Sequence, residues 1–157
     1  PWCDILVFSF MFRLGFSESQ RGDGVCATGY WLDEVAQMVE DFGGLAMAAH
    51  VDRDPRGFIA GPIPKEVKQR IHQSDHLSAL EITDPRYKSQ WNQGLMRYYP
   101  KPYACVQGSD AHAPKEVGRR PTFLILPALE LGGLRRAFYE YGERVRFPSE
   151  FQDGADG

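Results

Sequence analysis

The stretch GGLAMAAH, residues 43–50, decides the fold that we expect for this chain. It follows a segment, 30–42, whose apolar residues recur at helical spacing with charged residues on the other side: Leu32, Val35, Val39 and Phe42. The two glycines supply the left-handed cap that ends such a helix. The apolar run that follows is typical of a buried strand, and it ends in His50.

Strand-like and helical segments alternate along the rest of the chain. Further strands are predicted at 5–10, 79–82, 103–106 and 122–126, and further helices at 65–72, 85–98 and 131–141. This alternation favours an α/β fold with a mostly parallel sheet, in which active sites gather at the carboxyl ends of the strands. We expect one domain over 1–148 and a flexible polar tail over 149–157.

Composition limits the classes of function. The 157 residues suffice for one hydrophobic core, and 43% apolar and 25% charged residues are ordinary values for a folded protein. The net charge of −3, without a block of like charge, argues against a large nucleic-acid surface. The apolar runs are too short to span a bilayer. Three cysteines without a C-x-x-C pair favour reduced thiols and a cytoplasmic location.

Polar side chains stand at the ends of three predicted strands. His50 ends the first, Glu81 lies near the end of 79–82, and Asp110 and His112 follow 103–106 after a Gly-Ser turn. Because the carboxyl ends of parallel strands share one edge, these side chains are expected to converge. Imidazole and carboxylate suit a divalent transition metal, which lowers the pKa of bound water to about 7 and offsets charge on a phosphoryl oxygen. The pattern predicts a hydrolytic metal site.

Each residue also has a purely structural interpretation. Asp110 is equally suited to cap a turn, and His112 to lie on the surface. A buried Glu81 needs a partner, which is an arginine or a further histidine as readily as a metal. His72 and His76 lie in a polar stretch and are expected to be solvated loop residues.

Arginines follow both polar turns. Arg53 stands directly behind the first, and Arg119 comes after the Asp-x-His turn. Because the guanidinium fork matches phosphate oxygens, both are candidates for binding a substrate phosphate beside the metal. The alternative is that they are surface charges paired with Asp54 or Glu116.

Together these segments resemble the later motifs of the PHP (polymerase and histidinol phosphatase) superfamily; the matching stretches are 43–53, 79–82, 108–112 and 116–119. The resemblance implies a partial or distorted (β/α)7 TIM-like barrel that holds two or three manganese, zinc or iron ions. It also implies that His50, Asp110 and His112 are metal ligands, and Glu81 matches a recurrent acidic position of the family.

The chain departs from the family at one motif. PHP proteins open with His-x-His on their first strand, whereas the histidines here are residues 50, 72, 76 and 112 only. We therefore expect either the C-terminal portion of a PHP domain or a degenerate member that lost half of the site. The start at Pro1, which leads at once into an apolar run at 5–8, favours the first of these.

The expected function is metal-dependent hydrolysis of a phosphoester. The substrate would be a phosphomonoester, a nucleotide or a nucleic-acid phosphodiester, and the parent protein would carry or associate with other domains. One alternative is a catalytically incomplete PHP-like scaffold or regulatory module, which the missing His-x-His supports. A metal-dependent amidohydrolase is a further alternative, because such enzymes also use His and Asp ligands at strand ends.

Overall fold

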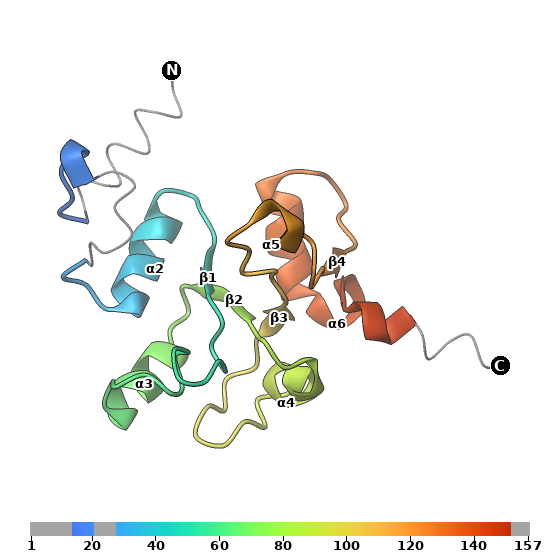
Figure 1. The fold of residues 1–157 in the computed structure, drawn as a ribbon, viewed down its shortest axis with the longest axis horizontal. Helices are drawn as coiled ribbons and strands as arrows, with labels where there is room; N and C mark the ends of the chain where they lie inside the picture. The colour runs from blue at the N-terminus through green and yellow to red at the C-terminus, as the bar shows by residue number, and fades with distance from the viewer. Residues whose placement is uncertain (1–13, 21–27, 152–157) are drawn as a thin grey trace.

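The computed structural model describes residues 14–20 and 28–151, which fold around a small parallel sheet (Figure 1). The strands are β1 (Ala46–Ala48), β2 (Leu77–Glu81), β3 (Ala104–Val106), β4 (Phe123–Leu124) and β5 (Val145–Arg146). The α-helices are α2 (Leu32–Asp41), α3 (Lys65–His72), α4 (Lys88–Asn92), α5 (Leu131–Tyr139) and α6 (Tyr141–Arg144). Short 3-10 helices are η1 (Glu18–Gln20), η2 (Pro85–Tyr87), η3 (Pro114–Glu116) and η4 (Pro148–Phe151).

Three strands form the sheet that positions the candidate site. Their order is β1-β2-β3, and both pairings are parallel, with Leu80 opposite Cys105 and Glu81 opposite Val106. The strands predicted at 45–49, 79–82 and 103–106 are therefore confirmed, within one or two residues at each end. Their carboxyl ends lie at one edge of the sheet, as the parallel arrangement requires.

The helix before β1 is fixed by its own ends. The Glu34 carboxylate accepts a hydrogen bond from the backbone N–H of Trp31 at 2.6 Å, which satisfies one donor that the first turn leaves free. Gly43, at φ 77°, ends the helix in the left-handed conformation predicted for it. The helix predicted over 30–42 is confirmed as α2, and that over 65–72 coincides with α3.

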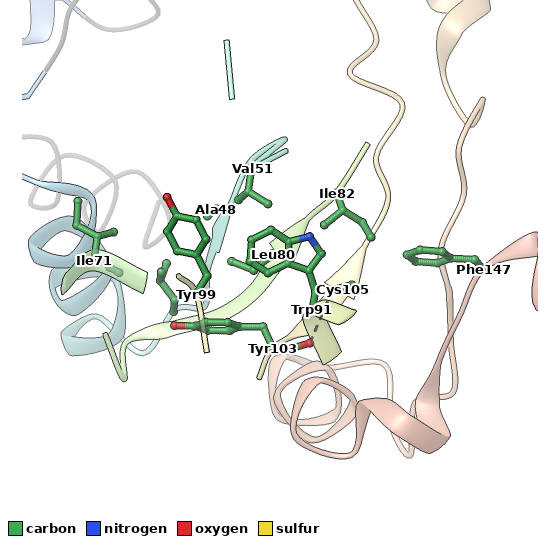
Figure 2. Packing of buried hydrophobic residues seen from close by; sticks show 12 residues of the cluster. Ala48, Val51, Ile71, Leu80, Ile82, Trp91, Tyr99, Tyr103, Cys105 and Phe147 are labelled. Atoms are coloured by element: carbon green, nitrogen blue, oxygen red, sulfur yellow. Dashed lines mark hydrogen bonds between the residues drawn. The ribbon is translucent and has the colours of Figure 1, made fainter. Parts of the chain in front are cut away.

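Strands β2 and β3 are covered on both faces, whereas Met47 of β1 is 50% exposed. Leu80 and Cys105 pack with Trp91 of α4 and Ile71 of α3 on one face (Figure 2). On the other, Ala79 and Ala104 pack against residues from the chain after β4, including Phe138 of α5. Figure 1 shows α2 and α3 on one side of the sheet, and α5 and α6 on the other. Burial on both faces explains why β3 is a continuous apolar run.

The predicted barrel is wrong. Within the described residues the parallel sheet has three strands, too few for a (β/α)7 barrel, and it does not close. The strand expected at 122–126 is only β4, and it pairs antiparallel with β5 in a separate two-stranded sheet. Within the segment 122–126, Phe123 and Ile125 are 47% and 56% exposed, whereas a strand inside a barrel wall is covered on both faces.

Two further expectations differ from the structure. The helix expected over 85–98 is reduced to η2 and α4, and the chain from 93 onward forms a long connection to β3. His72 is not a solvated loop residue: it ends α3 with 2% of its surface exposed, among the rings of Trp91, Tyr99 and Tyr103. The strand predicted at 5–10 lies outside the described residues.

Candidate functional site at the carboxyl edge of the sheet

The turn after β1 places His50 next to the end of β2. Its backbone N–H donates to Glu81 Oε2 at 3.3 Å, and the N–H of Val51 donates to the backbone oxygen of Glu81 at 2.9 Å. His50 adopts φ 33°, a left-handed conformation that a residue with a side chain seldom takes. Its Nδ1 is buried and has no hydrogen-bond partner. The imidazole therefore offers an unsatisfied nitrogen at the sheet edge.

Glu81 lies between the two outer turns. While one carboxylate oxygen accepts from His50, the other lies where Gly108 leaves room for it. A Cβ atom built on Gly108 would come within 2.7 Å of Glu81 Oε1, so a side chain at this position would displace the carboxylate. The predicted Gly-Ser turn thus has a role that the sequence did not reveal: it lets the β3 turn approach the β2 carboxylate closely.

Asp110 is held by an arginine from the neighbouring turn. Arg53 Nη1 donates to Asp110 Oδ2 in a direct ion pair, which joins the turns after β1 and β3. Partial burial by itself would raise the pKa of Asp110, but the charge and hydrogen bond of Arg53, with the charges of His112 and His50, lower it. Asp110 also has a left-handed backbone, at φ 48°. Arg53, which the sequence suggested as a phosphate-binding residue, thus forms an ion pair with Asp110, which it suggested as a metal ligand.

His112 lies on the outer, exposed side of this turn. Its Nδ1 lies 2.9 Å from the backbone oxygen of Asp110, so in the neutral ring Nδ1–H donates there and Nε2 carries the free lone pair. Its backbone N–H donates to Glu116 Oε2 at 2.9 Å, and this bond is the main cause of the lowered pKa of Glu116. Glu116 was expected from the sequence to pair with an arginine, and in the structure it also holds the backbone of His112.

Arg119 is fastened over the same turn. Its Nη2 donates to the backbone oxygen of Ser109 at 3.0 Å, and its Nη1 lies 3.7 Å from Glu116 Oε1. Half of its side chain stays exposed, so the guanidinium keeps free donors on its outer side. The surface pairing with Glu116 considered from the sequence is present, whereas Arg53 pairs with Asp110 rather than with Asp54.

Asp52 is a structural residue. Its Oδ1 accepts hydrogen bonds from the backbone N–H and the hydroxyl of Thr83, at 2.7 and 2.8 Å. Its Oδ2 accepts from the N–H of Asp84 at 3.1 Å. A carboxylate with this many donors fixes the turn after β1 to the turn after β2, and so holds His50 and Glu81 in place.

The donor set fits a divalent ion in its chemistry but not in its present arrangement. Two imidazoles and two carboxylates, from His50, His112, Glu81 and Asp110, are the ligand types that manganese, zinc and iron accept. Yet within residues 14–20 and 28–151, no group of three or more His, Cys, Asp or Glu side chains is disposed to hold an ion. Arg53 occupies Oδ2 of Asp110, so a metal ion that used this oxygen would compete with the arginine.

Comparison of the chain with protein-family models, curated proteins and solved structures found no match. The likeness to PHP proteins therefore rests on the motifs alone. In the part of the chain that the structure describes, no helix combines the length and apolar character needed to cross a bilayer.

Proposed function

We propose that the carboxyl edge of the sheet is a metal-dependent phosphoesterase site of the PHP type. The observation that carries the proposal is the gathering of His50, Glu81 and Asp110 at one edge, with the Nδ1 atom of His50 buried and unpartnered. The left-handed backbone at both His50 and Asp110 supports it, because strained residues persist where surrounding structure holds them for a purpose.

In this proposal His50, Glu81, Asp110 and His112 would hold the ion. A bound divalent ion supplies a more acidic water and offsets charge on the phosphate. The protein's own part is to bind and orient: Arg119, tied to the backbone of Ser109, presents its outer N–H groups to phosphate oxygens. When the ion pair between Arg53 and Asp110 opens, the Arg53 guanidinium can donate to oxygens of the same phosphate. The substrate class is a phosphomonoester, a nucleotide or a nucleic-acid end, in a cytoplasmic protein whose buried Cys105 thiol is free.

The test measures Mn²⁺ binding by titration calorimetry and release of p-nitrophenol from p-nitrophenyl phosphate, both on the full-length protein. Asp110→Asn and His50→Gln should each weaken Mn²⁺ binding by at least about tenfold and abolish turnover. His76→Gln is the matched control, because His76 pairs with Glu40 on the surface. A full-length protein that binds no Mn²⁺ and releases no phosphate would contradict the proposal.

The Arg53–Asp110 ion pair favours one alternative, a phosphate-binding module without catalysis. With Asp110 already neutralised, the two arginines suffice to hold an anion while no metal is present. The same experiment separates the two functions. Inorganic phosphate that binds in a manner dependent on Arg119, without Mn²⁺ binding or turnover, would establish the alternative.

A further inference from the structure

A second concave surface lies away from the sheet edge, between α3 and the connection from α4 to β3. Its volume is about 330 Å³, within the range of small-molecule sites. Apolar side chains contribute its walls: Ile59, Ile63 and Met96. Figure 1 shows the connection from α4 to β3 beside α3, and Gln69 of that helix donates to the Tyr98 backbone oxygen at 3.3 Å. We call this surface the α3 groove.

The turn 96–99 presents two of its residues in an unusual way. The backbone N–H of Tyr99 donates to Met96 at 2.9 Å, which closes the turn and puts Arg97 and Tyr98 at its tip. Tyr98 has φ 73°, at the turn position where glycine is favoured. Its side chain is 45% exposed, so burial does not account for keeping a large aromatic residue there. Strain of this kind points to a role for the ring itself.

The charges around the ring are all positive. Lys65 Nζ lies 3.4 Å from the centre of the Tyr98 ring and Arg97 Cζ lies 4.7 Å from it. Across residues 14–20 and 28–151, neither cation has a carboxylate within ion-pair distance, and no acidic residue lines the groove. A third cation, Lys68, is 7% exposed and donates to the backbone oxygens of Ile59 and Gly61. The groove therefore combines apolar walls with unneutralised positive charge.

We propose that the α3 groove binds a small anion that carries a flat apolar body, such as an aromatic phosphate, sulfonate or carboxylate. The flat body contacts Ile59, Ile63 and the Tyr98 ring, and the anionic group meets Lys65 and Arg97. Arginine and lysine at the rim match such an anion. The inference uses none of the residues at the sheet edge, so it is independent of the proposed phosphoesterase.

The experiment titrates the full-length protein with naphthalene-1-sulfonate at fixed ionic strength and follows binding by calorimetry and by the ligand's fluorescence. This probe has a flat body and an anion but no phosphoester to hydrolyse. Arg97→Gln and Lys65→Gln should each weaken binding about tenfold, because each removes one charge-assisted contact. Arg135→Gln on α5 removes the same charge elsewhere and should leave binding unchanged. Neutral naphthalene-1-methanol and sulfate alone should bind at least tenfold more weakly than the intact probe.

Tyr98→Gly distinguishes a ligand contact from a structural role. Glycine accepts φ 73° without strain, so this variant should keep or raise the thermal midpoint while it loses binding. The proposal is overturned if naphthalene-1-sulfonate does not saturate, or if Arg135→Gln weakens binding as much as Arg97→Gln does. It is equally overturned if sulfate alone binds as tightly as the probe, or if Tyr98→Gly binds like the wild type.

Discussion

The buried imidazole of His72 should make the protein lose stability in mild acid. His72 is 2% exposed, its Nε2 is buried without a partner, and three aromatic rings lie within 6 Å of it, ring centre to ring centre. Burial is the main cause that lowers the pKa of His72, and the charge of Lys101 lowers it further. The backbone hydrogen bonds with Tyr99 and Lys101 act in the opposite direction without reversing the shift. Figure 2 shows Tyr99, Tyr103 and Trp91 in this part of the core.

The sign and size follow from linkage. A histidine in the unfolded chain has a pKa of about 6.5, and the folded protein holds that of His72 below this value. The unfolded state therefore binds more protons as the pH falls below about 6.5, and stability declines from there toward the folded-state pKa. For one proton the slope approaches about 1.4 kcal/mol per pH unit. Against a typical total of about 5–15 kcal/mol, this upper limit corresponds to a loss of roughly a tenth to a quarter per pH unit.

The assay is urea unfolding followed by circular dichroism between about pH 7.5 and about pH 5.5, a range in which carboxylates contribute little. His72→Phe keeps an aromatic ring of similar size and should flatten the pH dependence in this range. His76→Gln is the matched control, because it removes a histidine and leaves the buried His72 ring in place. A His72→Phe protein with the same slope as the wild type would refute the argument.

Three further changes test other contacts. Lys88→Met should lower the free energy of unfolding by about 1–3 kcal/mol in urea titrations, because the buried ammonium donates to a backbone oxygen of β5 and to the Glu150 carboxylate, at 3.0 and 2.5 Å. Gly133→Ala should lower the free energy of unfolding by about 1–3 kcal/mol in the same assay, because the added Cβ would lie 2.1 Å from a backbone oxygen. Gly142→Ala is the control: nothing lies within 4 Å of its Cβ, so the free energy of unfolding should stay unchanged or rise slightly. Arg53→Gln should tighten Mn²⁺ binding about two- to fivefold in calorimetry, because it frees the carboxylate that the arginine now holds; unchanged or weaker binding would contradict this.

The parallel sheet was predictable because its signal is local. A strand buried on both faces must be apolar throughout, as 103–106 is; 45–49 is equally apolar, although Met47 is 50% exposed. The helix at 65–72 was predictable in the same way. Ile71 and His72 lie three and four residues after Lys68, which puts all three on one face of the helix, and all three are buried. Helical spacing therefore indicates a buried His72, whereas the polar composition around it indicates a loop, and the structure follows the spacing.

The barrel was not predictable, because closure depends on pairing between distant segments. Residues 122–126 have the apolar, β-branched character of a strand, but nothing in them specifies a partner. The partner is β5, which the reversal of the chain after α5 and α6 brings alongside in the antiparallel direction. The PHP-like motifs cover the turns, which carry the polar residues, and do not extend to the strands that would have closed the sheet.

The location of the candidate site could be predicted, because the carboxyl ends of parallel strands lie at one edge of the sheet. The contacts between its residues could not be predicted. Left-handed backbone at His50 and Asp110, and the close approach of Gly108 to Glu81, depend on the exact path of two turns. Sequence offered Arg53 and Asp110 as two separate groups, one for phosphate and one for metal. In the structure they are one ion pair.

That ion pair couples the two ligands of the proposed site. A phosphate that draws Arg53 toward itself frees Asp110 for a cation, and a cation at Asp110 releases Arg53 for phosphate. Binding of phosphate or of the cation thus opens the Arg53–Asp110 ion pair, which opposes binding of the other ligand. Linkage requires that each ligand raise the affinity for the other by the same factor. Mn²⁺ should therefore bind the wild type more tightly when inorganic phosphate is present, and phosphate more tightly when Mn²⁺ is present. In Arg53→Gln this mutual enhancement should fall to the part that direct attraction between the ion and the phosphate supplies, although Mn²⁺ alone binds better.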